Sequence, residues 1–222
     1  MSLSWAGFLS DVDRTRLFDH LTRTLGDVPA VAAIRAVPRE KFVPERLRHQ
    51  AYLNIPLSIG FGQTISQPLM VATAAQALLL QGDEYVLEVG AGSGYQAAVL
   101  SAMLPSGNVV AVERIPELVV MARRNLSGTG FGRVTVLEAG SVLGAPDRAP
   151  FDAILVSASA PSVPESLLAQ LKPGGRIVMP VGERSRQRLT RVWAHADERA
   201  YEELEPCSYV PLLGDEAWPE GS

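Results

Sequence analysis

A glycine-rich turn is the feature of this chain with the clearest chemical meaning. An apolar run over residues 85–89 leads directly into the turn 90–94, and a helical pattern follows over 95–104. This order brings backbone amides close to a nucleotide-like ligand. The spacing is G-x-G-x-G, with Tyr95 where a dinucleotide fingerprint has its third glycine, which favours S-adenosylmethionine over NAD. The predicted donor contacts are Glu88, Gly90, Ala91, Gly92, Ser93 and Gly94.

A second carboxylate, Glu113, ends the next apolar run at residues 108–113. In a doubly wound sheet this position lies beside the first glycine turn, where a carboxylate accepts hydrogen bonds from both ribose hydroxyls. Two structural alternatives stay open for Glu113. It pairs with Arg114, or it caps the helix that Pro116 opens. The glycine turn itself has a structural alternative as well, a tight strand–helix connection without a ligand.

The elements around these residues alternate between strand and helix. We expect strands over 84–89, 108–113, 133–138, 151–157 and 175–181, separated by helices over 95–104, 116–126 and 164–171. This alternation predicts an α/β fold with a parallel sheet covered on both faces.

The chain on either side of this core has a different pattern. Helices are expected over 11–25, 29–37, 44–50 and 69–80, with an irregular loop over 60–68. After Gly182, short strands over about 187–195 and 200–211 predict an antiparallel hairpin at the sheet edge, followed by a frayed tail from Gly214. We expect one domain over 1–222: a helical cap and substrate loop (1–68), a donor-binding core (69–182), and C-terminal strands with the tail (183–222).

Composition excludes several classes of partner. The 222 residues carry a net charge of −4, and nucleic-acid binding needs clustered Lys and Arg. The single Cys207 forms no internal disulfide and suits a reducing cytosol. No secretory signal is evident, and the apolar helix over 71–80 is too short to span a bilayer. His20, His49 and His195 lack ligand-like spacing. We expect a cytoplasmic monomer without a metal, nucleic-acid or membrane partner.

From about Val37 to Leu212 the chain resembles the protein-L-isoaspartate O-methyltransferase family. The segments that carry the resemblance are 37–45 (VPREKFVPE), 56–68 (PLSIGFGQTISQP), 86–96 (VLEVGAGSGYQ), 112–118 (VERIPEL), 151–156 (FDAILV), 171–176 (LKPGGR) and 209–212 (YVPL). The resemblance implies a Rossmann-like methyltransferase sheet with an N-terminal helical cap and a C-terminal β extension. It also implies methyl transfer from S-adenosylmethionine to the free carboxyl of L-isoaspartyl residues in damaged proteins or peptides, with S-adenosylhomocysteine as product.

This chemistry requires no general base. A carboxylate has a pKa near 4 and is ionised at neutral pH, and a sulfonium is already an activated methyl donor. The remaining task is alignment, which hydrogen-bond donors such as Thr64 and Ser66 provide. The resemblance assigns the catalytic role to Ser66. Local sequence alone leaves open a turn or helix cap ahead of Pro68.

Substrate recognition is expected to use mainly the backbone, because a repair enzyme accepts many neighbours of the altered residue. By resemblance, the peptide groove is lined by Ile59, Gly60, Tyr209, Val210 and Leu212. Without the resemblance, residues 209–212 read as an edge strand that Pro211 ends.

One departure from the family pattern concerns the donor pocket. The family carries Gly-Asp-Gly after the third strand, where the Asp accepts a hydrogen bond from the adenine amino group, and this chain has Ala139-Gly140-Ser141. Loss of a charged acceptor costs about 1.5–3 kcal/mol, unless Ser141 or a water accepts the bond. Three hypotheses follow: isoaspartyl repair, carboxyl methylation of an Asp in a biosynthetic peptide, and a noncatalytic binding protein on the same fold.

Overall fold

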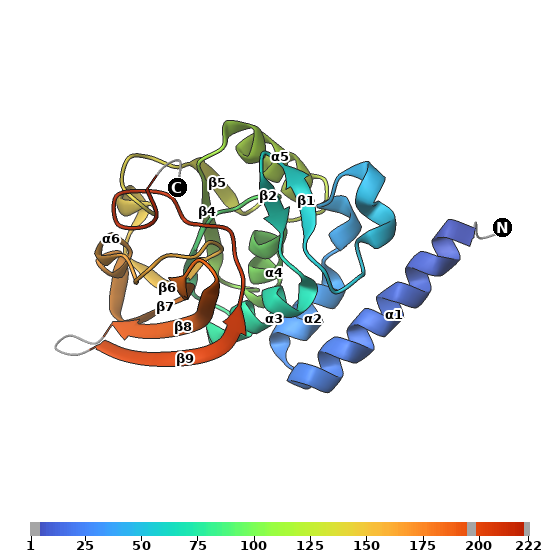
Figure 1. Cartoon of the computed structure of the whole chain (residues 1–222), viewed down its shortest axis with the longest axis horizontal. Helices are drawn as coiled ribbons and strands as arrows, with labels where there is room; N and C mark the ends of the chain where they lie inside the picture. Colours follow the sequence, from blue (N-terminus) through green and yellow to red (C-terminus); the bar gives the residue numbers. More distant parts are fainter. Residues whose placement is uncertain (1–4, 195–198, 220–222) are drawn as a thin grey trace.

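The computed structural model describes residues 5–194 and 199–219, so His195 lies outside the described residues. The centre of the molecule is a seven-stranded sheet with the order β5-β4-β3-β6-β7-β8-β9 (Figure 1). The strands from β5 to β7 are parallel, and β8 and β9 extend the sheet as an antiparallel edge. Their bounds are β3 Tyr85–Val89, β4 Asn108–Glu113, β5 Thr135–Glu138, β6 Phe151–Val156, β7 Leu171–Glu183, β8 Arg186–Ala194 and β9 Arg199–Cys207.

Helices cover one face of this sheet. Those that contact the strands are α3 Pro68–Ala77, α4 Tyr95–Met103 and α5 Pro116–Ser127. Outside them, α2 Pro29–Ala36 packs on α3 and α4, and α1 Trp5–Leu25 packs on α2 and α3. The other face is covered by the short α6 Glu165–Leu168, and the chain also forms 3-10 turns at Arg39–Lys41, Glu45–Gln50 and Pro146–Arg148. Within the described residues, none of the helices has the length and apolar character needed to cross a membrane.

The two faces of the sheet have separate hydrophobic cores. Successive side chains of a strand point to opposite faces, so Val86 of β3 packs in the core beneath the helices and Leu87 packs in the core on the opposite face. Both residues are fully buried. The predicted α/β sheet with two covered faces is confirmed.

Strand β3 lies where the order of the sheet reverses. The chain continues from β3 to β4 and β5 on one side, and then places β6 and β7 on the other side. In open parallel sheets, ligands bind outside the carboxyl ends of the strands at this switch point. The fold therefore places the glycine turn after β3 at the expected ligand crevice.

Some predicted elements were wrong in type or length. The loop expected over 60–68 contains a hairpin of β1 (Leu57–Gly60) and β2 (Gln63–Ile65), closed by a tip of three residues with positive φ: Gly60, Phe61 and Gly62. The helix expected over 44–50 is a 3-10 turn. The helix expected over 164–171 is the four-residue α6, because β7 already begins at Leu171.

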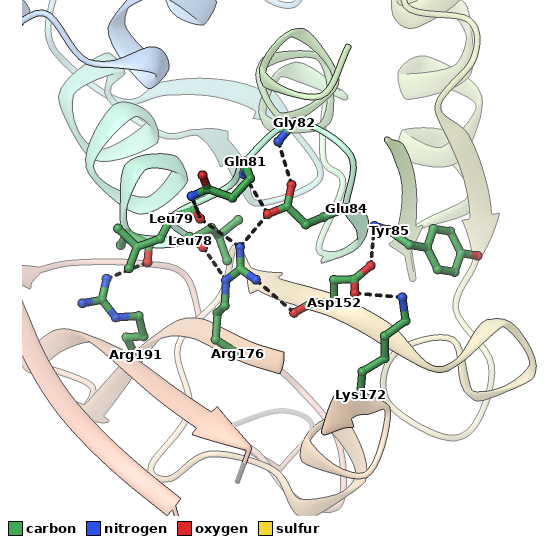
Figure 2. A network of polar contacts seen from close by, with 11 residues as sticks. Leu78, Leu79, Gln81, Gly82, Glu84, Tyr85, Asp152, Lys172, Arg176 and Arg191 are labelled. Carbon is green, nitrogen blue, oxygen red and sulfur yellow. Dashed lines mark hydrogen bonds and ion pairs between the residues drawn. The ribbon is translucent and has the colours of Figure 1, made fainter. Parts of the chain in front are cut away.

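A polar network fixes the amino ends of the central strands. Arg176 of β7 donates to the carbonyl oxygens of Leu78 and Leu79 and forms an ion pair with Glu84 at 3.0 Å (Figure 2). Glu84 also accepts hydrogen bonds from the amides of Gln81 and Gly82, at 2.8 and 2.9 Å. These contacts hold the connection between α3 and β3 against β7. They lie at the amino ends of the strands, and the glycine turn lies at the carboxyl ends.

The charge state of Glu84 follows from these contacts. Burial raises the pKa of Glu84, but the amides of Gln81 and Gly82 and the Arg176 guanidinium outweigh it, so the pKa lies below its ordinary value. Stability from this ionised pair is therefore present above the unfolded-state pKa of about 4.3 and is lost as the pH falls through the lowered value.

We predict that Arg176→Met lowers the free energy of unfolding by about 3–5 kcal/mol, because it leaves the buried Glu84 carboxylate without its counter-charge. Urea denaturation at pH 7 measures this loss. The control is Lys172→Met, which removes a neighbouring pair with Asp152 at 2.8 Å whose side chains are 42% and 28% exposed, and which should cost less than about 1 kcal/mol. Equal losses in the two variants would contradict the prediction.

Candidate active site

A cavity of about 880 Å³ opens at the carboxyl ends of β3, β4 and β6, within the size range of small-molecule sites. Most of its lining comes from residues 63–66, 88–93, 112–115, 139–144, 157–158 and 210–217. The hairpin, the glycine turn and the chain beyond the last strand therefore meet around one space. Of the predicted site residues, those that line it are Thr64, Ser66, Glu88, Gly90, Ala91, Gly92, Ser93, Glu113, Gly140, Ser141, Val210 and Leu212.

The glycine turn is held by the end of the neighbouring strand. The amides of Gly90 and Ala91 donate to the Val112 carbonyl oxygen, at 2.9 and 3.0 Å. Gly94 adopts a φ of +85°, and a Cβ on it would lie 3.1 Å from Leu126 and 3.3 Å from Ala122 of α5. Gly94 thus allows the turn to pack closely on α5 and does not itself line the cavity.

Glu113 joins the glycine turn to the start of α5. Its side chain is buried, with Oε2 accepting from the Gly92 amide at 2.8 Å and Oε1 accepting from the Ile115 amide at 3.0 Å. The sequence left open a structural role for Glu113 at the start of α5, and the bond to the Ile115 amide is such a role. A carboxylate has about four acceptor positions, so Glu113 retains capacity for ribose hydroxyls in the cavity.

Glu88 is the most deeply buried carboxylate of the cavity. Its Oε1 accepts from the Ser157 hydroxyl at 3.3 Å, and its Oε2 has no hydrogen-bond partner among the described residues. Burial raises the pKa of Glu88 well above its ordinary value, the Ser157 bond lowers it, and the nearby Glu113 raises it further. A bound cation would favour the ionised form of Glu88, so this corner of the cavity suits a positively charged group.

Ser66 lies between the hairpin and the chain beyond β9. Burial raises the pKa of Tyr209 above its ordinary value, and the Ser66 side chain beside it lowers that pKa. Gln187 fixes the Tyr209 backbone by accepting from its amide at 2.7 Å and donating to its carbonyl oxygen at 3.3 Å.

The helix-cap alternative for Ser66 is not what the structure shows. The N-cap residue of α3 is Gln67, which makes no side-chain cap. Asn54 Oδ1 accepts from the Leu69 amide at 3.0 Å instead. Ser66 is therefore available to the cavity.

Only some of the predicted peptide-groove residues line the cavity, namely Val210 and Leu212. Ile59, Gly60 and Tyr209 do not line the cavity, and the Ile59 side chain packs against Gly92, 3.4 Å from where a Cβ would lie. Residues 209–212 lie beyond the end of β9 at Cys207 rather than in its edge strand. They pair with Ser159 instead, through bonds of 2.8 Å from the Ser159 amide to Val210 O and from the Leu212 amide to Ser159 O.

Two contributors to the cavity were missed by sequence reasoning. Ser157 directly follows β6, and its place at the carboxyl end of a predicted strand was the available signal. The chain from Gly214 was expected to fray, but residues 214–217 and Pro219 line the cavity. The frayed tail predicted from Gly214 is thus wrong as far as Pro219, and residues 220–222 lie outside the described part.

Gly140 lies on an open part of the wall. It does not adopt a left-handed conformation, and a Cβ built on it would meet no atom within 4 Å. The wall around it, 139–144, contains no carboxylate side chain. The structure therefore leaves room for a side chain at Gly140.

The site combines a cavity at the switch point of the parallel strands, a glycine turn, and a carboxylate at the end of the next strand. This combination is typical of the Rossmann-like class of S-adenosylmethionine-dependent methyltransferases. A family model described as Protein-L-isoaspartate(D-aspartate) O-methyltransferase (PCMT) matches residues 14–217. The chain belongs to this family.

Named relatives are similar over nearly their whole length. A Protein-L-isoaspartate O-methyltransferase 2 of Marinobacter nauticus is 49% identical over 218 residues, covering 95% of this chain and 97% of that one. A Protein-L-isoaspartate O-methyltransferase of Methanopyrus kandleri is 49% identical over 213 residues, covering 93% and 94%.

Solved structures agree with this fold. A protein-L-isoaspartate O-methyltransferase superposes with a TM-score of 0.81 at 28% identity, covering 92% of this chain and 67% of that one. A Plasmodium falciparum protein of the same family name, in complex with S-adenosyl-L-homocysteine, superposes with a TM-score of 0.78 at 24% identity, covering 89% and 96%.

The contrast between two glycines gives a testable prediction for the site. Gly94→Ala should lower the free energy of unfolding by about 2–4 kcal/mol, from the left-handed φ together with overpacking against α5. The matched variant Gly140→Ala should change it by less than about 0.5 kcal/mol. Urea denaturation of the two variants measures the difference. Similar effects from both substitutions would show that the turn is not constrained as described.

Proposed function

We propose that this protein transfers a methyl group from S-adenosylmethionine to the free carboxyl of L-isoaspartyl residues in damaged proteins or peptides. One observation carries the proposal within the family. The cavity brings Thr64 and Ser66, which can position a carboxylate, to the same space as the glycine turn and Glu113, which suit a nucleoside.

The residues present fit the donor. Glu88 Oε2 is a buried acceptor without a partner among the described residues, and it suits the ammonium group of the donor's amino acid end. We expect Glu113 to accept from the ribose, and the glycine turn allows a close approach of the ligand. When bound, S-adenosylmethionine supplies an activated methyl group on a positively charged sulfur.

The protein's role toward the acceptor is positioning. The substrate carboxylate is ionised at neutral pH, so none of the cavity side chains has to remove a proton from it. The Thr64 and Ser66 hydroxyls orient the carboxylate, and Ser66 lies beside the Tyr209 side chain. Alignment of this kind supplies roughly 7–11 kcal/mol in favourable cases.

The substrate's backbone is the expected recognition element. Val210 and Leu212 line the cavity as an extended segment beside Ser159, and a polypeptide can lie along such a segment with varied side chains. The backbone nitrogen that follows the methyl ester then attacks its carbonyl carbon and expels methanol, which closes a succinimide, and hydrolysis of this ring returns some normal aspartate. A cytoplasmic location and a monomeric state stay predictions from the sequence.

The direct test is methyl transfer to an isoaspartyl peptide and to its aspartyl twin of the same sequence. We expect turnover of the first and little or none of the second. Equal turnover of both peptides would instead indicate an aspartyl acceptor, and donor binding without any turnover would indicate a noncatalytic protein.

Ser66→Ala should lower the methylation rate by about a hundredfold, the scale of one lost oriented donor, and should change S-adenosylhomocysteine affinity less than twofold. The control is Ser127→Ala, at the exposed end of α5, which should leave the rate unchanged.

The rate of the wild-type protein should be flat from about pH 6 to 8, since the nucleophile is ionised throughout. A bell-shaped profile with a midpoint near 6.5 would point to a histidine and contradict the mechanism.

A further inference from the structure

The connection between the hairpin and α3 contains Ser66, and it is fixed on both sides. On one side, Ile65 is the last residue of β2, is buried, and pairs with Leu57 of β1. On the other side, α3 begins at Pro68, whose ring locks its own φ. Only Ser66 and Gln67 lie between these two fixed points. The place of the Ser66 hydroxyl therefore follows from where β2 ends and where α3 starts.

The start of α3 depends on a side chain from outside the helix. The first amides of a helix have no acceptor within it. Pro68 has no amide hydrogen, and the N-cap residue Gln67 makes no side-chain cap. The Leu69 amide comes next, and it donates to Asn54 Oδ1 at 3.0 Å. Asn54 lies 15 residues earlier in the chain, just before β1. The first turn of α3 is therefore tied to the chain that enters the hairpin.

Asn54 is itself held in place by the outermost helix. Its Nδ2 donates to His20 Nε2 of α1 at 3.3 Å, and the side chain is half-buried. An amide group suits this position because it is a donor and an acceptor at once. One side chain thus connects α1 to the first turn of α3, and both of its polar atoms are engaged.

We propose that Asn54 is a positioning residue for methyl transfer, because its bond to the Leu69 amide sets the place of the Ser66 hydroxyl in the cavity. This inference rests on the proposed function, in which Ser66 orients the acceptor carboxylate. A displacement of about 1 Å at such a group can cost on the order of a hundredfold in rate. Asn54 does not line the cavity, so it acts through Ser66 and not on the ligands.

Two substitutions of Asn54 test this role. Asn54→Asp keeps an acceptor for the Leu69 amide, at a helix start where a carboxylate is favoured, and should retain the methylation rate within about threefold. Asn54→Leu has a similar size and no acceptor. It should lower the rate at saturating peptide and donor by at least about tenfold, and change S-adenosylhomocysteine affinity less than about twofold.

The matched control is Thr73→Val, in the same helix. The Thr73 hydroxyl donates to the other backbone group of Leu69, its carbonyl oxygen, at 2.9 Å. Because this bond lies within α3 and does not reach the connection, its loss should leave the methylation rate unchanged. An Asn54→Leu protein as fast as the wild type, or an Asn54→Asp protein as slow as Asn54→Leu, would overturn the inference and leave the proposed function standing.

A double variant separates positioning from a general loss of stability. If Asn54 acts through Ser66, adding Asn54→Leu to Ser66→Ala should slow the reaction little beyond Ser66→Ala alone. Two independent effects would instead multiply. Multiplied effects in folded proteins would show that Asn54 does not act through Ser66, and would overturn the inference.

Amide hydrogen exchange tests the same geometry without catalysis. The Leu69 amide should exchange at least about tenfold faster in Asn54→Leu than in the wild type or in Asn54→Asp, because it loses its acceptor. Equal exchange in the three proteins would overturn the inference. A wild-type protein that methylates neither peptide would overturn the proposed function and the catalytic role of Asn54 together, and the exchange rates would still show whether Asn54 holds the start of α3.

Discussion

The site depends on one carboxylate that joins the ends of two parallel strands. Glu113 accepts from the Gly92 amide of the turn after β3 and from the Ile115 amide at the start of α5. Because β3 and β4 are in parallel register, their carboxyl ends lie side by side, and Val112 adds two more bonds to the turn. The position of the glycine turn, and so the shape of the cavity, follows from this arrangement.

The two sides of the cavity differ in charge: carboxyl groups line the donor side, and neutral hydroxyls line the acceptor side. Glu88 and Glu113 line the donor side, and a bound cation favours the ionised form of the buried Glu88, which suits a ligand with a sulfonium and an ammonium group. The acceptor of the proposed reaction is itself a carboxylate, and acidic side chains would repel it. The side chains assigned to it, Thr64 and Ser66, are neutral hydroxyls, so the attraction between acceptor and donor is not opposed at the point of transfer.

Strand, turn and helix around the donor were predictable because their signals are local. The apolar runs, the glycine spacing and the carboxylate at the end of β4 all lie within 85–113. The hairpin was missed because it turns at three residues with positive φ, including Phe61, which sequence does not mark as a turn residue. Its role was still assigned, through the resemblance of 56–68 to a family.

The C-terminal loop, residues 212–218, was missed for a different reason. The segment is short, and from Gly214 on its sequence resembles a frayed tail. Its order comes from partners far away in sequence: Ser159, Ser166 and Arg184. The same holds for the cap of α3, which Asn54 provides from a preceding loop. Contacts of this kind depend on the assembled fold and leave no periodic pattern in the sequence.

The most direct measurement of the account's central claim is the S-adenosylhomocysteine affinity of Glu113→Ala, determined by calorimetry on protein shown to be folded. Glu138→Ala is the matched control, since Glu138 is the register partner of Glu113 on β5, is exposed, and does not line the cavity. We expect a loss of about 2 kcal/mol for Glu113→Ala, or roughly thirtyfold, and no change for Glu138→Ala. Unchanged affinity in a folded Glu113→Ala protein would contradict this expectation.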